Sequence, residues 1–129
     1  MTTVATVLRV LIRACAVVLV LLGILFWTGN ALGLRPLHQF LGFVLVISLW
    51  TLAVLAARAG ASLGLVAGAA AWGLVVPILG MTQTSLLTGS AHWVIRVLHL
   101  LVGLAAVGLG EALAARVHAL APATRPQAS

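Results

Sequence analysis

The sequence contains four long apolar runs, and each is about as long as a helix that crosses a lipid bilayer. The hydrocarbon core of a bilayer is about 30 Å thick, and a helix spans it with about 20 apolar residues. The runs extend over residues 4–27, 37–57, 61–81 and 91–115. Short segments rich in glycine, proline, threonine and arginine separate them, as is typical of turns. The pattern predicts an all-α, integral membrane four-helix bundle.

Charged residues are too rare for a soluble domain. They make up 6% of the 129 residues, and apolar residues make up 64%, whereas soluble proteins have about 25% charged residues. The net charge of +6 comes from arginines that stand singly at the ends of the apolar runs, so we do not expect nucleic acid as a partner. The single cysteine, Cys15, excludes an intrachain disulfide, a thiolate iron–sulfur cluster and a covalently attached c-type haem.

The arginines predict the orientation of the bundle, because arginine near the ends of membrane helices accumulates on the cytoplasmic side. Arg35 falls on one side, and Arg96 lies in the fourth run near the same end. The others fall on the opposite side, namely Arg9, Arg13, Arg58, Arg116 and Arg125. We therefore expect a plasma-membrane protein with both termini cytoplasmic, one transmembrane domain over residues 1–120, and a disordered cytoplasmic tail over residues 121–129.

The first run has an alternative interpretation. Arg9 and Arg13, followed by the apolar residues 14–27, also resemble a secretory signal peptide. No small-x-small cleavage pattern follows Trp27. We therefore interpret the run as a retained helix.

The second and fourth runs share a gapless repeat that contains a histidine. Residues 35–46, RPLHQFLGFVLV, align with residues 96–107, RVLHLLVGLAAV. Arg, Leu, His, Gly and Val coincide, and Arg and His are scarce in this composition. The offset of 61 residues is about half the chain, so the sequence predicts two duplicated helical hairpins, residues 1–59 and 60–120, related by an axis along the membrane normal.

The repeat places two histidines at the same depth. In an up-down bundle the second and fourth helices are diagonal, and facing side chains build sites in the core. His38 and His99 are then expected to face each other about one turn inside the outer leaflet. Two imidazoles so placed can ligate a flat macrocycle from both faces, and iron held in this way suits one-electron transfer. We predict that His38 and His99 bind a haem b.

The residues around each histidine suit the same chemistry. Gly42 and Gly103 are one turn below their histidines on the same face, which would leave room for a porphyrin edge. Arg35 and Arg96 are one turn above, where a guanidinium can pair with a propionate carboxylate. The alternative is that each histidine is a polar anchor or a hydrogen-bonded residue of the bundle.

Two further histidines have less defined roles. His92 lies two turns before His99 on the same face, so it is an alternative axial ligand to His99, a second-site ligand, a proton or quinone contact, or an interfacial anchor. His118 lies beyond Arg116 at the cytoplasmic end and is expected to be solvated.

Glu111, the only acidic residue, lies near the inner end of the fourth run. We expect it to form a salt bridge with Arg58, Arg13 or Arg116. A proton-relay role is the alternative, because ionisable groups inside a membrane are costly and often functional.

Small residues recur every four positions in the third and fourth runs, which allows helices to approach closely in lipid. We expect ordinary packing from this pattern, with a dimer face as the alternative. The residues are Gly60, Gly64 and Gly68, and Ala106, Gly110 and Ala114.

The two histidine segments resemble one half of the haem A synthase family and, more loosely, the small four-helix membrane b-type cytochromes. The likeness covers two of the four helices and rests on an x-Leu-His-x-x-x-Gly setting at His38 and on a second histidine near the outer end of the fourth helix. In the family both histidines bind haem, which by motif implies His38 and His99. The family has an acidic residue where this chain has Arg35, and it has a second four-helix half. The resemblance therefore implies haem binding rather than haem A synthesis.

The function predicted from the sequence is one-electron transfer by a membrane-embedded haem b protein, with a quinol or a respiratory membrane complex as partner and a homodimer as a further association. Whether it is an enzyme stays open; oxidoreductase is the class that fits. The alternatives are a haem-free accessory or assembly subunit of a larger membrane complex, and a small transporter, for which Glu111 is too near the inner interface.

Overall fold

The computed structural model describes residues 1–121 and contains, over that range, helices and turns but no strands. The all-α prediction is confirmed, and all four long helices are long and apolar enough to cross a membrane. The helices are α1 (Thr2–Trp27), α2 (Arg35–Arg58), α3 (Leu63–Thr82) and α4 (His92–Ala119), with 3₁₀ turns η1 (Leu32–Leu34) and η2 (Gln83–Ser85).

The helix bounds follow from local chemistry. α2 begins with Arg35 and has Pro36 in its first turn, where a missing N–H costs no helical hydrogen bond. α4 continues to Ala119, beyond the predicted end at residue 115. Gly29 has a φ of +78° in the turn after α1, a conformation that glycine adopts without strain. The predicted tail falls almost entirely on residues 122–129, which lie outside the described residues.

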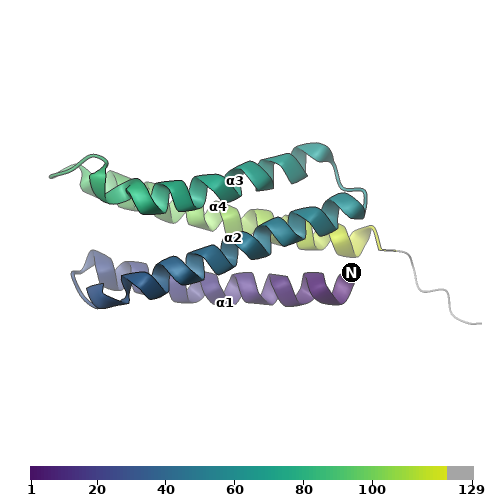
Figure 1. Cartoon of the computed structure of the whole chain (residues 1–129), viewed down its shortest axis with the longest axis horizontal. Helices are drawn as coiled ribbons and strands as arrows, with labels where there is room; N and C mark the ends of the chain where they lie inside the picture. Colours follow the sequence, from purple (N-terminus) through teal and green to yellow (C-terminus); the bar gives the residue numbers. More distant parts are fainter. Residues whose placement is uncertain (122–129) are drawn as a thin grey trace, which may run out of the picture.

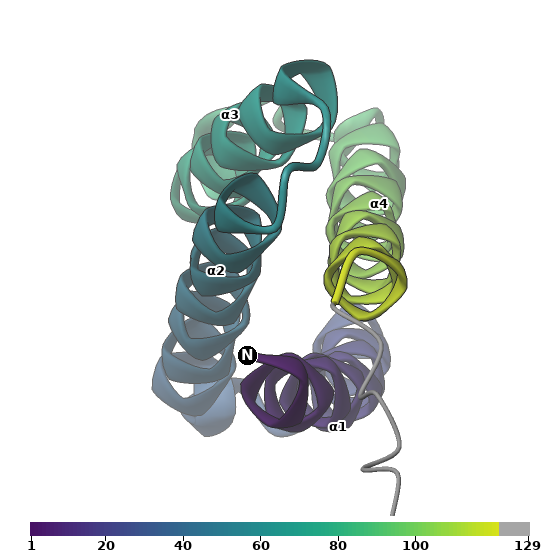
Figure 2. The ribbon, with the colours of Figure 1, turned by 90° about the vertical axis from the view of Figure 1, so that its right-hand side faces the viewer.

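The four helices alternate in direction and form a ring in chain order (Figures 1 and 2). Each helix packs against the next, and α4 packs against α1. Within the described part of the chain, α2 and α4 also contact each other across the bundle, whereas α1 and α3 do not. The predicted diagonal placement of α2 and α4 is therefore confirmed, and these two helices lie closer together than α1 and α3 do.

The buried core lies toward one end of the bundle. In α2 every buried residue falls between Leu45 and Ala56, and none falls in the first ten residues of the helix. Large side chains from three helices meet there with almost no exposure, as expected for a close-packed interior; they include Ile12, Leu49, Leu52 and Leu113. We call this region the packed end. It lies toward the end of the molecule that holds the N-terminus and the α2–α3 connection (Figure 1).

The small residues of the two predicted stripes have different roles. Ala106, Gly110 and Ala114 of α4 are buried in the packed end, and a Cβ at Gly110 would lie 2.8 Å from Cδ1 of Ile12. On α3, Gly64 and Gly68 are exposed, and a Cβ at either would meet nothing within 4 Å. The α4 stripe is thus ordinary helix packing, and the α3 stripe faces outward.

Two tryptophans link neighbouring helices through their indole N–H groups. Trp50 Nε1 donates to the Ala70 carbonyl at 3.1 Å, and Trp72 Nε1 donates to the Val102 carbonyl at 2.9 Å. Gly73 makes room for the Trp50 indole, because a Cβ at this position would collide with Trp50 Nε1. Such bonds satisfy polar groups that would otherwise face hydrocarbon.

Glu111 forms a charged link between α4 and α1. Its carboxylate accepts hydrogen bonds at 2.6 Å from Arg9 Nε and at 2.6 Å from Arg13 Nε. The predicted pairing with Arg13 is confirmed, but Arg58 and Arg116 are not partners, and Arg9 was missed. The reason is helix order: α1 is the neighbour of α4, and two arginines one turn apart on α1 face the same carboxylate.

His118 is exposed but not simply solvated. Its Nε2 lies 3.0 Å from Thr6 Oγ1, and its Nδ1 lies 2.7 Å from the Ala114 carbonyl oxygen. The prediction of a solvated side chain is therefore incomplete, because the ring also joins α4 to α1.

Candidate functional site

His38 and His99 come together between the diagonal helices α2 and α4. Their ring centroids are 6.2 Å apart, and the ring planes are inclined at 42°. Both residues are half-buried, and the ring of Phe26 from α1 lies 5.5 Å from the His38 ring. The repeat thus brings its two scarce histidines side by side in space.

Both histidines have a buried nitrogen with no partner. Nδ1 of His38 and Nδ1 of His99 are inaccessible and make no hydrogen bond within the described chain. The other two histidines differ, since Nδ1 of His92 lies 3.1 Å from the Leu86 carbonyl oxygen and Nδ1 of His118 also has a carbonyl partner. An unsatisfied buried polar group costs about 1–3 kcal/mol. A ligand that bonds to Nδ1 of either ring would therefore remove this cost.

A cavity of about 430 Å³ surrounds the two histidines and is lined by all four helices and η2. This volume lies in the range of about 300–1,000 Å³ that is usual for small-molecule and cofactor sites. The lining includes α1 residues such as Leu19 and Val20 on one wall and α3 residues such as Val76 and Pro77 on the other. The space extends to both sides of the α2–α4 diagonal, in keeping with the lack of α1–α3 contact. We call it the histidine cavity.

Each of the four helices contributes a glycine to this lining. A Cβ at Gly23, Gly42 or Gly103 would meet nothing within 4 Å, so open space lies beside all three. A Cβ at Gly80 would lie 3.2 Å from Cε1 of His99. The predicted glycines Gly42 and Gly103 line the cavity, and two further glycines join them.

The end of the cavity near the α1–α2 and α3–α4 connections is polar. Arg35 and Arg96 line it, and the Arg96 guanidinium carbon lies 5.9 Å from the ring centroid of Trp27, within cation–π range. The remaining polar residues of the lining are Gln39, Gln83, Thr84 and His92. Because Glu111 is bound by Arg9 and Arg13, no acidic side chain of the sequence remains for Arg35 or Arg96.

The cavity lining repeats with the same offset of 61 residues as the sequence motif. The relation includes α1 and α3, where the paired residues are not identical and the sequence carries no detectable repeat. The pairs of lining residues are Ala16/Pro77, Leu19/Gly80, Val20/Met81, Gly23/Thr84, Arg35/Arg96, His38/His99, Gln39/Leu100, Gly42/Gly103 and Phe43/Leu104. Corresponding positions of the two hairpins thus form opposite walls.

The distance between the histidines fits two imidazoles on one metal ion. With a metal–nitrogen bond of about 2.0 Å and about 1.15 Å from ring centre to nitrogen, two trans imidazoles have centroids roughly 6.3 Å apart. The described residues contain no group of three or more His, Cys, Asp or Glu side chains that could hold a bare metal ion. Two imidazoles beside open glycines fit a metal whose other ligands come from a macrocycle.

Sequence reasoning found the histidines, arginines and two glycines, but not the contribution of α1 and α3. His92 lines the same cavity as His99, near its polar end, so it remains an alternative ligand. Phe26, Trp27, Gly23 and Gly80 were missed, because nothing in the repeat marks them.

In comparisons with known proteins, no family model, no curated protein and no solved structure matches this chain.

Proposed function

We propose that this protein is a membrane-embedded haem b protein in which His38 and His99 would hold the haem, and that its role is one-electron transfer. One observation carries the proposal. Two imidazoles from duplicated segments lie 6.2 Å apart with buried, unpartnered nitrogens, in a cavity with open glycines on three helices. Iron held by two neutral imidazoles supplies reversible one-electron redox chemistry.

The residues of the chain have distinct tasks in this proposal. His38 and His99 fix the position of the iron from opposite helices. Gly42 and Gly103 leave space for the macrocycle edge, and Arg35 and Arg96 pair with its carboxylates at the polar end. The apolar residues of α1 and α3 shield the rest of the macrocycle, which keeps the local dielectric low and influences the redox potential.

The proposal includes an orientation in the membrane. Arg9, Arg13, Arg58 and Arg116 belong to helix ends that lie at the same end of the bundle (Figure 1). By the positive-inside rule this end is cytoplasmic in the plasma membrane, and the histidine cavity is near the outer leaflet. A quinol or a respiratory membrane complex would exchange electrons there.

The test is the absorption spectrum of the protein purified in detergent after growth with added haem precursor. A Soret band that sharpens on reduction, with split visible bands, would support two histidine ligands. Alanine at His38 or at His99 should abolish the low-spin spectrum.

His118→Ala is the matched control, because it removes an imidazole outside the cavity. A low-spin spectrum that survives His99→Ala but not His92→Ala would transfer the ligand role to His92.

A haem-free accessory or assembly subunit is the second candidate. It is favoured by the exposed, open glycines Gly64 and Gly68 of α3, which would let a helix of another protein approach closely. A colourless, folded protein that co-purifies with a larger membrane complex would support it and would refute the haem proposal.

A further inference from the structure

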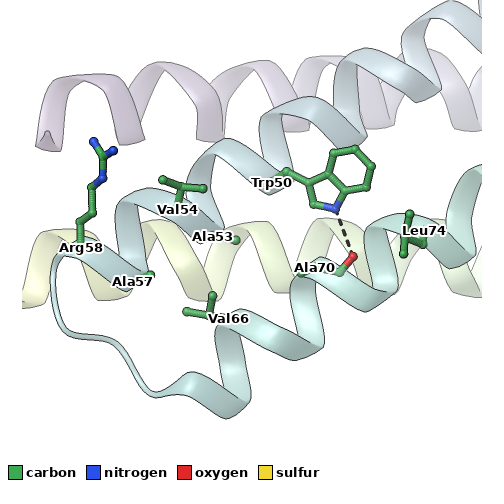
Figure 3. A pocket seen from close by; sticks show the side chains of 8 residues that line it. All are labelled: Trp50, Ala53, Val54, Ala57, Arg58, Val66, Ala70 and Leu74. Atoms are coloured by element: carbon green, nitrogen blue, oxygen red, sulfur yellow. Dashed lines mark hydrogen bonds between the residues drawn. The ribbon is translucent and has the colours of Figure 1, made fainter.

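A second hollow lies on the outside of the bundle, between α2 and α3 (Figure 3). Its volume is about 490 Å³. The lining is apolar except for one arginine and consists of Trp50, Ala53, Val54, Ala57, Arg58, Val66, Ala70 and Leu74. We call it the α2–α3 groove. It shares no lining residue with the histidine cavity.

Side-chain size explains the groove. Alanines from both helices line its middle, namely Ala53 and Ala57 of α2 and Ala70 of α3. Trp50 borders it, and its indole is held by the hydrogen bond to the Ala70 carbonyl (Figure 3). From Trp50 to Arg58 the groove follows nine residues of α2, which are separated by eight rises of about 1.5 Å and so extend over roughly 12 Å. That length is close to one leaflet of hydrocarbon, about 15 Å.

Arg58 borders one end of the groove with its aliphatic stem, and its exposed guanidinium points away from Val66 and Ala70 (Figure 3). It is the last residue of α2. Glu111 is the only acidic side chain of the sequence and is already bound by Arg9 and Arg13. The guanidinium of Arg58 therefore has no carboxylate side chain to pair with, and an anion from outside the protein would complement it.

We propose that the α2–α3 groove binds one anionic glycerophospholipid, with an acyl chain along the alanines and the phosphate on Arg58. The apolar lining suits a hydrocarbon chain, and the guanidinium can form two parallel hydrogen bonds to a phosphate. Basic pockets between transmembrane helices on the cytoplasmic side are typical sites for anionic headgroups. A zwitterionic lipid binds less well, because its own cation offsets the attraction to its phosphate.

The experiment measures lipid retained by the purified protein in native mass spectrometry. The protein is exchanged into detergent with equal amounts of phosphatidylglycerol and phosphatidylcholine that carry the same acyl chains. We expect one phosphatidylglycerol per protein in clear preference. Arg58→Gln should lower its retention about fivefold, the effect of one cation near a membrane surface.

Arg116→Gln is the control for charge, because it removes a cation from the same end of the bundle but not from the groove. It should leave retention within about twofold of the unchanged protein. If both substitutions lower retention equally, the attraction is general and the proposal fails. Equal retention of the two lipids also refutes it.

A matched pair of alanines tests the groove itself. Ala70 and Ala67 are both exposed on α3, but only Ala70 lines the groove. Ala70→Phe should abolish retention, and Ala67→Phe should not. If Ala70→Phe lowers the thermal unfolding temperature, Ala57→Leu replaces it, since Ala57 is exposed on the facing helix.

Retention that survives filling of the groove overturns the proposal, as does equal binding of soluble glycerol phosphate. A mass of two chains that Ala70→Phe converts to one would assign the groove to a second copy and refute the lipid. These results do not depend on haem binding, which is read separately from the absorption spectrum.

Discussion

The packed end and the histidine cavity use glycine and arginine in opposite ways. In the packed end and its α2–α3 contact, a neighbour fills the space beside each glycine, Ile12 at Gly110 and Trp50 at Gly73, and Glu111 neutralises Arg9 and Arg13. Around the histidine cavity, Gly42 and Gly103 face open space and the arginines have no acidic partner. Glycines in the first region bring helices together, whereas those in the second preserve a volume that the fold itself does not need.

Filling the cavity should produce the largest effect and leave the packed end intact. Gly42→Leu or Gly103→Leu puts a side chain into space that the proposed macrocycle would occupy, so bound haem per protein should fall at least about tenfold, the equivalent of about 1.4 kcal/mol. The pyridine haemochrome assay measures it. Gly64→Leu, at an exposed and open glycine of α3, is the control and should leave haem content unchanged. A loss of stability with Gly42→Leu would show that this region also holds the fold together.

Filling a closed glycine should instead destabilise the bundle. Gly73→Ala forces Trp50 out of its place and breaks its bond to Ala70, so the free energy of unfolding should fall by about 2 kcal/mol. Unfolding in mixed micelles followed by circular dichroism measures it. Gly68→Ala on the same helix meets nothing within 4 Å and should stabilise by about 0.5 kcal/mol. Equal effects of the two substitutions would mean that the Trp50 contact is unimportant.

Removing the charge of Glu111 should have a smaller effect, confined to the packed end. Glu111→Gln leaves Arg9 and Arg13 adjacent without their shared carboxylate, so the apparent melting temperature should fall by a few degrees, and by less at high salt. Arg116→Gln, which breaks no ion pair in the described chain, should not change it. A changed haem spectrum in Glu111→Gln would show that the two regions are coupled.

The smallest expected effect is a shift of the spectrum without loss of haem. Gly80→Ala places a methyl group 3.2 Å from His99 Cε1, so the ring must move by a few tenths of an ångström. Electron paramagnetic resonance of the oxidised protein should show altered g values. Gly68→Ala, at an exposed and open glycine outside the cavity, should leave them unchanged; identical spectra for all three proteins would argue against ligation by His99.

Much of the fold followed from the sequence because helix length and hydropathy are local properties. Four runs of bilayer length determined the number and order of the helices, and short connections determined their alternating directions. The repeat then located His38 and His99, since two scarce residue types recurred with one offset. The bounds of α4 differed by a few residues, because residues 116–119 contain no glycine or proline that would end the helix.

The partners of Glu111 and the roles of Gly23 and Gly80 depend on how each helix is rotated about its axis. The sequence is compatible with several such rotations. Glu111 had several arginines near the same end of the bundle, and only helix packing selected Arg9 and Arg13. Gly23 and Gly80 could not be assigned, because their partners in the other hairpin are Thr84 and Leu19 and share no identity with them.

The pairing of lining residues on opposite walls of the histidine cavity has a consequence for any planar ligand whose two sides differ. Turning such a ligand by 180° about the axis that relates the two hairpins exchanges the hairpin that each of its sides faces, so the imidazoles, the guanidinium groups and two of the glycines would contact it in the same way. Both ways of insertion would be occupied, and paired resonances in a proton spectrum would report their ratio. Only the unequal partners, such as Leu19 opposite Gly80 and Gln39 opposite Leu100, would favour one over the other.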